Sequence, residues 1–117
     1  MANLRPVRKG YIAGDDREFV FTHGSYMRIE ELLDCSMDEV VQRVAINRAG
    51  KLKDYLALLY FTCDDLCKSF SFHAFSEAMG FLFHRETEVQ ELVHLLLADA
   101  IGIDSDSGLK KKETTSE

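Results

Sequence analysis

The chain has 117 residues, of which 46% are hydrophobic and 29% charged, and its formal net charge is −6. The length allows one domain, and this balance is typical of an ordinary globular protein rather than a disordered or fibrous one. The negative charge argues against non-specific binding to nucleic acid, which needs a basic face. The small basic cluster of Arg5, Arg8 and Lys9 is more typical of a solvated surface.

Three cysteines, Cys35, Cys63 and Cys67, leave one without a partner if the other two pair. Since the first residues hold no apolar stretch of signal-peptide length, we expect free thiols in a reducing, cytoplasmic compartment. The longest apolar-rich stretch, Tyr55–Cys63, is about half as long as the roughly 18 residues of a membrane span. We therefore expect no membrane contact.

The first elements in the chain are predicted to be an arm and a short strand. Residues 1–16 contain the only proline and two glycines, which predict a flexible N-terminal arm. Glu18–Phe21 is rich in β-forming residues and is bounded by turn-forming residues, so it predicts a strand. Gly10–Ala13 can pair with this strand across a turn at residues 14–16.

Two helices are predicted next, because apolar residues recur at the helical period from Ser25 onward. Ser25 is a candidate N-cap for the first of them. Ser36 and Glu39 have the spacing of a capping box, in which each residue's side chain accepts from the other's backbone N–H. They predict the start of a second helix, which ends before Gly50.

The segment Lys51–Lys68 is the longest and most apolar, and it is predicted to be one helix. Its apolar residues cover much more than half of its girth, which is typical of a helix that is buried on several sides or that forms one wall of an oligomer contact. The apolar side chains outside its main stripe are Leu58, Tyr60 and Phe61.

Two more helices and a tail complete the prediction. One helix begins near Phe72 and brings phenylalanines to the core. The last begins with a second capping box at Thr87 and Gln90 and ends at Gly102, which occupies the position favoured by glycine after a helix. Residues 104–117 are mostly Ser, Asp, Lys, Thr and Glu, and predict a disordered tail.

The predicted fold is therefore mainly α, or α+β with a small N-terminal β element. After one short strand or hairpin we expect a compact bundle of about five helices. This helical domain spans residues 17–103, between the arm and the tail.

No pattern of catalytic or metal-binding residues stands out. Cys63 and Cys67 lie four apart on one helix face and can offer two thiolates to a metal, but no second pair completes a zinc site. On an apolar stripe, free cysteine behaves as a small hydrophobic residue. The histidines do not follow H-E-x-x-H, and neither a phosphate loop nor an EF-hand loop occurs. We expect no enzyme activity and no cofactor; a metal- or thiol-dependent enzyme built on Cys63, Cys67 and His73 is the weaker interpretation.

One segment carries a family resemblance. After the strand "REFVFT", residues 29–33 read Ile-Glu-Glu-Leu-Leu, and Cys35, Ser36, Met37, Glu39 and Val40 follow. These residues resemble the pattern LEE-φ-G-x-S/C-φ-x-E-φ, where φ is apolar, of the tail assembly chaperones of long-tailed (siphovirus-type) bacteriophages. Asp34 and Cys35 stand where that family usually has a glycine before the second helix. The resemblance covers roughly residues 17–103.

The resemblance implies a non-enzymatic protein that binds and solubilises the tape measure protein during tail assembly in the host cytoplasm. It also implies self-association into oligomers or spirals. Within that picture the predicted contact residues are Leu58, Tyr60 and Phe61. A cellular helical adaptor that binds a partner peptide with the same apolar helix is the alternative.

The resemblance further implies a −1 ribosomal frameshift near the end of the gene, whose extended product recruits tail tube subunits. Lysine is encoded only by AAA or AAG, so Lys110, Lys111 and Lys112 are candidates for residues encoded by a slippery sequence. The alternative is that the three lysines form a solvated, charged tail.

Overall fold

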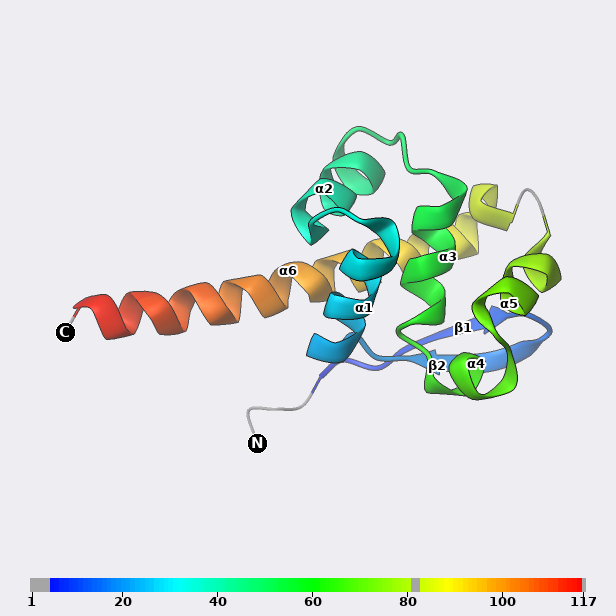
Figure 1. The fold of residues 1–117 in the computed structure, drawn as a ribbon, viewed down its shortest axis with the longest axis horizontal. Helices are drawn as coiled ribbons and strands as arrows, with labels where there is room; N and C mark the ends of the chain where they lie inside the picture. Colours follow the sequence, from blue (N-terminus) through cyan, green and yellow to red (C-terminus); the bar gives the residue numbers. More distant parts are fainter. Residues whose placement is uncertain (1–4, 81–82, 117) are drawn as a thin grey trace.

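The computed structural model describes residues 5–80 and 83–116, with side chains up to Ile103. In these residues six α-helices follow a two-stranded antiparallel sheet (Figure 1). The predicted mainly α fold with a small N-terminal β element is therefore confirmed.

The sheet is a hairpin of β1 (Arg8–Ile12) and β2 (Asp15–Phe19). Ile12 lies opposite Asp15, so Ala13 and Gly14 alone form the turn, with φ of +54° and +84°. Positive φ at both positions is the type I′ geometry, whose twist matches that of the flanking strands. The predicted hairpin is confirmed, but its bounds are different: the turn lies at residues 13–14 and not at 14–16, and β2 ends at Phe19 and not at Phe21. Residues 8–16, predicted to belong to the N-terminal arm, are part of this hairpin.

Helix α1 (His23–Leu33) begins with a capping box of its own. Thr22 Oγ1 accepts from Ser25 N at 3.1 Å, and Ser25 Oγ accepts from Thr22 N at 3.3 Å. The prediction of Ser25 as N-cap is wrong, because Ser25 is the third residue of the helix. The helix ends at Asp34, whose φ of +55° and ψ of +42° are left-handed.

Helix α2 (Met37–Val41) begins at the predicted capping box, which is confirmed. Ser36 Oγ accepts from Glu39 N at 3.2 Å, and Glu39 Oε1 accepts from Ser36 N at 3.1 Å. The helix then widens into a π-helical turn, η1 (Gln42–Ile46).

The prediction of one helix over Lys51–Lys68 is wrong, because the chain breaks it in two. Helix α3 spans Leu52–Tyr60 and helix α4 spans Asp64–Ser69. The intervening Cys63 is extended, with φ of −127° and ψ of 106°.

Thr62 accounts for this break. Its hydroxyl is buried and donates to the Leu58 carbonyl at 2.6 Å, in competition with the helical backbone. Its carbonyl accepts from Val20 N at 2.7 Å, just after β2, instead of from a helical N–H. The contact with the hairpin thus takes the place of the next helical hydrogen bond.

The C-terminal half contains α5 (Phe72–Met79), the 3₁₀ turn η2 (Phe83–Arg85) and α6 (Thr87–Ser116). Helix α5 ends at Gly80, with φ of +80°. The carbonyl of Glu86 accepts from Gln90 N at 3.0 Å, so Glu86 occupies the N-cap position predicted for Thr87. The predicted helix end at Gly102 is wrong, since the α6 backbone continues to Ser116.

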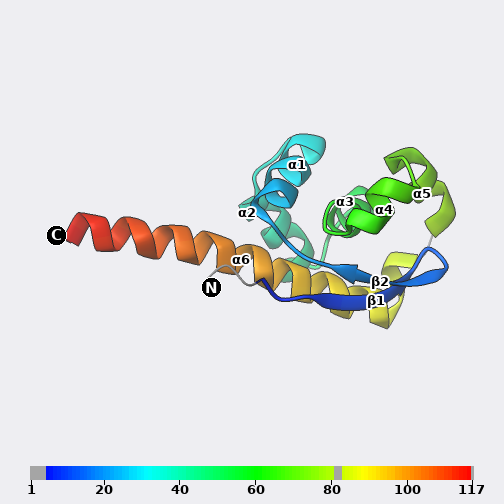
Figure 2. The ribbon, with the colours of Figure 1, turned by 90° about the horizontal axis from the view of Figure 1, so that it is seen from below.

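Helix α3 lies at the centre of the molecule, against α1, α5 and α6, while β1 packs on α6 (Figures 1 and 2). All residues of α3 from Asp54 to Tyr60 are at most 8% exposed. The largest fully buried side chains come from the hairpin region and from α1 to α6: Phe19, Phe21, Phe75, Ile29, Met37, Leu58, Leu59, Leu66, Leu96 and Leu97. The core thus joins all parts of the described chain up to Ile103.

Candidate functional site

The predicted contact residues of α3 lie mainly inside the protein. Leu58 is 0% exposed and Tyr60 8% exposed, whereas Phe61 is half-buried. The premise that these three side chains lie outside the packed face is wrong for Leu58 and Tyr60, because α1, α5 and α6 surround α3 on several sides. That they mediate self-association or partner binding stays a prediction, for which Phe61 alone offers exposed surface.

Tyr60 is the centre of an aromatic cluster that joins α3 to α5. Its ring centroid lies 5.1 Å from that of Phe61, 5.4 Å from that of Phe72 and 5.6 Å from that of Phe75. Its hydroxyl donates to the Phe70 carbonyl at 2.7 Å. Such packing stabilises the fold, so Tyr60 has a structural role in this arrangement.

The cysteines considered as catalytic candidates are held in packed surroundings. Cys63 is buried and Cys67 half-buried, and burial raises the pKa of both thiols. His73 is exposed on α5. Among the residues that the structure describes, no three His, Cys, Asp or Glu side chains form a group that could hold a metal ion.

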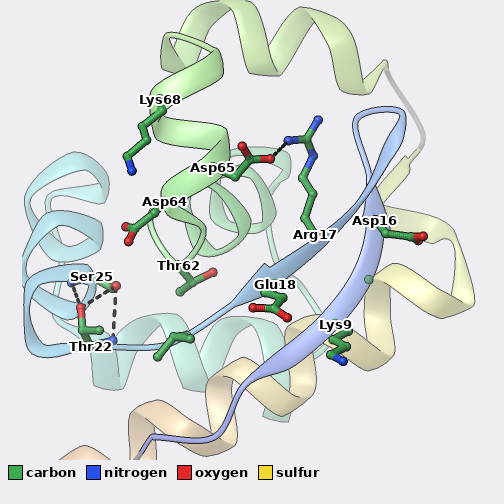
Figure 3. Close-up of a pocket in the computed structure, with 12 residues that line it drawn as sticks. Lys9, Asp16, Arg17, Glu18, Thr22, Ser25, Thr62, Asp64, Asp65 and Lys68 are labelled. Carbon is green, nitrogen blue, oxygen red and sulfur yellow. Dashed lines mark hydrogen bonds and ion pairs between the residues drawn. The ribbon is translucent and has the colours of Figure 1, made fainter.

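A groove of about 880 Å³ lies between β2 and α4 and is here called the β2–α4 groove (Figure 3). Arg17 closes its wall next to the turn: Nε donates to the Ile12 carbonyl at 2.7 Å, and Nη1 forms an ion pair with Asp65 of α4. Asp64 and Lys68 come from α4, on the opposite side from β2 (Figure 3).

The hydroxyls of the β2–α4 groove are used by the fold. Thr22 and Ser25 bond each other at 3.0 Å within the α1 capping box, and the Thr62 hydroxyl bonds the Leu58 carbonyl. The β2–α4 groove is therefore lined by side chains of both charges and by hydroxyls that the fold already engages.

A second hollow, of about 260 Å³, lies between β1 and the first turns of α6 and is here called the β1–α6 cleft. An added Cβ on Gly10 would lie 2.8 Å from Leu92 Cδ2, so a larger residue at this position would require the Leu92 side chain to shift. Arg8 donates to both carboxylate oxygens of Asp99, at 2.9 and 2.6 Å. Hydrogen bonding to Asp99 raises the pKa of Arg8.

The rim of the β1–α6 cleft combines exposed apolar and acidic side chains. Tyr11 is 70% and Leu95 44% exposed, and both line the cleft. Lys9 of β1 is the cation of the lining. Three glutamates lie on the α6 side: Glu86, Glu88 and Glu91. The sequence analysis did not predict this cleft. The one signal for it in the sequence was Gly10, since a glycine inside a predicted strand can mark a close approach of another element.

The segment that carries the family resemblance forms a compact junction between α1 and α2. Glu30 Oε2 accepts from Met37 N at 2.8 Å, so a side chain of α1 caps the start of α2. Asp34 adopts the left-handed conformation that glycine usually supplies after a helix. Lys110–Lys112 lie on the α6 backbone, outside the residues whose side chains are described, and their link to a frameshift stays a prediction.

No helix among the described residues is long and apolar enough to cross a membrane. No family model, curated protein or solved structure matches the chain. The residue pattern and the geometry are thus the grounds for inferring its function.

Proposed function

We propose that the protein is a non-enzymatic phage tail assembly chaperone that binds and solubilises the tape measure protein during tail morphogenesis. The observation that carries the proposal is the junction between α1 and α2. Two glutamates of the resembling pattern fix the start of α2: Glu30 Oε2 accepts from Met37 N, and Glu39 Oε1 accepts from Ser36 N.

The departure from the family pattern at Asp34 has a structural explanation that supports the proposal. A glycine is favoured where a helix ends in a left-handed residue. Asp34 has that conformation, and aspartate is among the residues that tolerate it. The position of the missing glycine is therefore filled by a residue that makes the same turn.

The proposal includes self-association, a host-cytoplasmic location and a minor frameshifted product that recruits tail tube protein. The coding DNA gives the first test. We expect a slippery heptamer at the codons of Lys110–Lys112, a long open −1 frame and a downstream gene for a long helical protein.

Co-expression gives the second test. The downstream product is expected to be insoluble alone and soluble with this chain, and to co-elute with it in size-exclusion chromatography. If the coding DNA holds no −1 frame and the neighbouring products neither bind nor become soluble, the proposal is wrong and the adaptor interpretation takes its place.

A further inference from the structure

We infer that the outer edge of β1 is a docking site for an extended, basic segment of a partner protein, which adds to the hairpin as a third strand. The inference does not need the partner to be a tape measure protein, so it stands apart from the proposed function. It rests on the backbone groups of β1, the apolar side chains beside them and the charge of the β1–α6 cleft.

The ladder register leaves backbone groups of β1 facing outward. With a two-residue turn, Ile12 and Asp15 are a hydrogen-bonded pair, and pairs alternate along the strands. Lys9 and Tyr11 are therefore non-hydrogen-bonded positions, whose N–H and C=O groups point away from β2. Within the described residues, no further backbone hydrogen bond reaches either of them.

The edge of β2 is less open than that of β1. Asp16 N donates to Asp15 Oδ1 at 2.8 Å, and Val20 N, just beyond the strand, donates to the Thr62 carbonyl. One outward N–H group within β2 and one just beyond it thus already have partners. A third strand can therefore form backbone hydrogen bonds with the outward N–H and C=O groups of β1.

The side chains next to the β1 edge favour an apolar and basic occupant. Tyr11 is 70% exposed, and Leu95 on the facing helix is 44% exposed. The exposed Glu86, Glu88 and Glu91 form no ion pair in the described part of the chain. A second copy would bring another acidic surface here, since the net charge is −6, so a basic partner is favoured over self-pairing.

The pleat of a strand specifies the pattern of the partner segment. Gly10 faces α6, so Tyr11 faces the opposite side of the hairpin. In an added strand, alternate side chains would likewise lie towards Glu88 and Glu91 of α6 or beside Tyr11. We therefore expect basic residues at every second position and apolar residues between them.

The test uses the full chain labelled with ¹⁵N and two short, end-blocked peptides, one alternating lysine and valine and the other glutamate and valine. We expect the lysine peptide to bind at least about tenfold more tightly, with an affinity that falls as salt screens the charges. We also expect it to slow hydrogen exchange of the Lys9 and Tyr11 amides by about tenfold or more, while amides in the β1–β2 ladder change little.

Matched variants separate backbone pairing from charge. Tyr11→Pro removes the outward N–H and is expected to abolish binding, whereas Tyr11→Ala keeps this N–H and should retain part of it; proline is tolerated at such an edge position. The pair Lys9→Pro and Lys9→Ala replaces this comparison if Tyr11→Pro does not fold. E88Q/E91Q is expected to weaken binding of the lysine peptide about tenfold relative to Glu77→Gln, which changes an exposed glutamate on α5.

Equal binding of the two peptides, or binding that leaves the Lys9 and Tyr11 amides unchanged, would overturn the inference. Binding that survives the proline variants as well as the alanine variants would do so too. None of these outcomes depends on whether the tape measure protein is the partner.

Discussion

Asp54 is a buried carboxylate, 1% exposed, at the start of the central helix α3. It accepts from Arg43 Nε and Nη2 and from Lys51 N, each at 2.8 Å. These bonds tie the π-helical turn η1 to α3, and the bond to Asp54 raises the pKa of Arg43. A charge this deeply buried is tolerated because its hydrogen bonds are made.

Removing Arg43 and removing Asp54 are expected to lower the free energy of unfolding by different amounts. Arg43→Ala leaves the Asp54 charge buried, and should lower the free energy of unfolding by about 3 kcal/mol. Asp54→Ala should cost about 2 kcal/mol, because the Arg43 side chain is 26% exposed and can turn towards water. Urea denaturation measures both. Lys53→Ala, at an exposed position on α3, is the control and should change stability by less than about 0.5 kcal/mol. Equal losses for the two partners would contradict the asymmetry.

Burial of the Cys63 and Cys67 thiols leads to a prediction about pH. Because burial raises both pKa values above those of the unfolded chain, the neutral thiols stabilise the fold fully below about pH 8.5, the ordinary value. This contribution is lost as pH rises through the raised values, where the unfolded chain has released protons that the folded chain still binds.

We therefore expect iodoacetamide to modify Cys63 at least about tenfold more slowly in the folded protein than in urea at neutral pH. Peptide mass spectrometry measures the two rates, and the urea-unfolded chain is the control. Unfolding midpoints should also fall above about pH 8.5. Fast labelling of Cys63 in the folded protein at neutral pH would show that this thiol is not shielded.

At the scale of elements, features set by neighbouring residues could be predicted from the sequence, whereas features set by contacts between distant residues could not. The Ser36–Glu39 box spans one helical turn, so its spacing alone predicted the start of α2. The break at Thr62 depends on Val20, far away in the chain, and no periodicity within α3 and α4 contains that contact. The β1–α6 cleft likewise needs Gly10 against Leu92, a contact that sequence spacing cannot reveal.

The turn of the hairpin can be improved by one substitution. Ala13 has φ of +54° in a type I′ turn, where asparagine before glycine is preferred and alanine is not. Ala13→Asn should raise the free energy of unfolding by about 0.5–1 kcal/mol, since alanine is strained at positive φ. Thermal unfolding measures the effect. The converse variant is Gly14→Ala, at φ of +84° and with nothing within 4 Å of the added Cβ, so it should destabilise through the backbone alone. No gain from Ala13→Asn would mean that the turn does not limit hairpin stability.

At the scale of the molecule, α6 has two different parts. Its first half carries the buried side chains that pack on β1 and α3, from Val89 to Ile103. Its last turns extend beyond the other elements (Figures 1 and 2), which gives the chain a long axis of 51 Å against 32 and 24 Å. The prediction of a disordered tail concerns this extension.

Helical turns that extend into water without a packed face are marginal, because nucleation is costly and glycine, serine, threonine and aspartate are poor helix formers. Residues 104–116 are rich in these types. We therefore expect their amides to exchange with solvent at nearly the unprotected rate, while those of Leu92–Leu97 are protected in the core.

Removal of residues 104–117 should change the free energy of unfolding by less than about 0.5 kcal/mol. A truncation that also removes Ile103, which is 4% exposed, should cost at least about 1 kcal/mol more. Slow exchange throughout residues 104–116, or a large loss on removing them, would mean that the extension is a stable helix held by a contact of its own, such as a second copy or a partner.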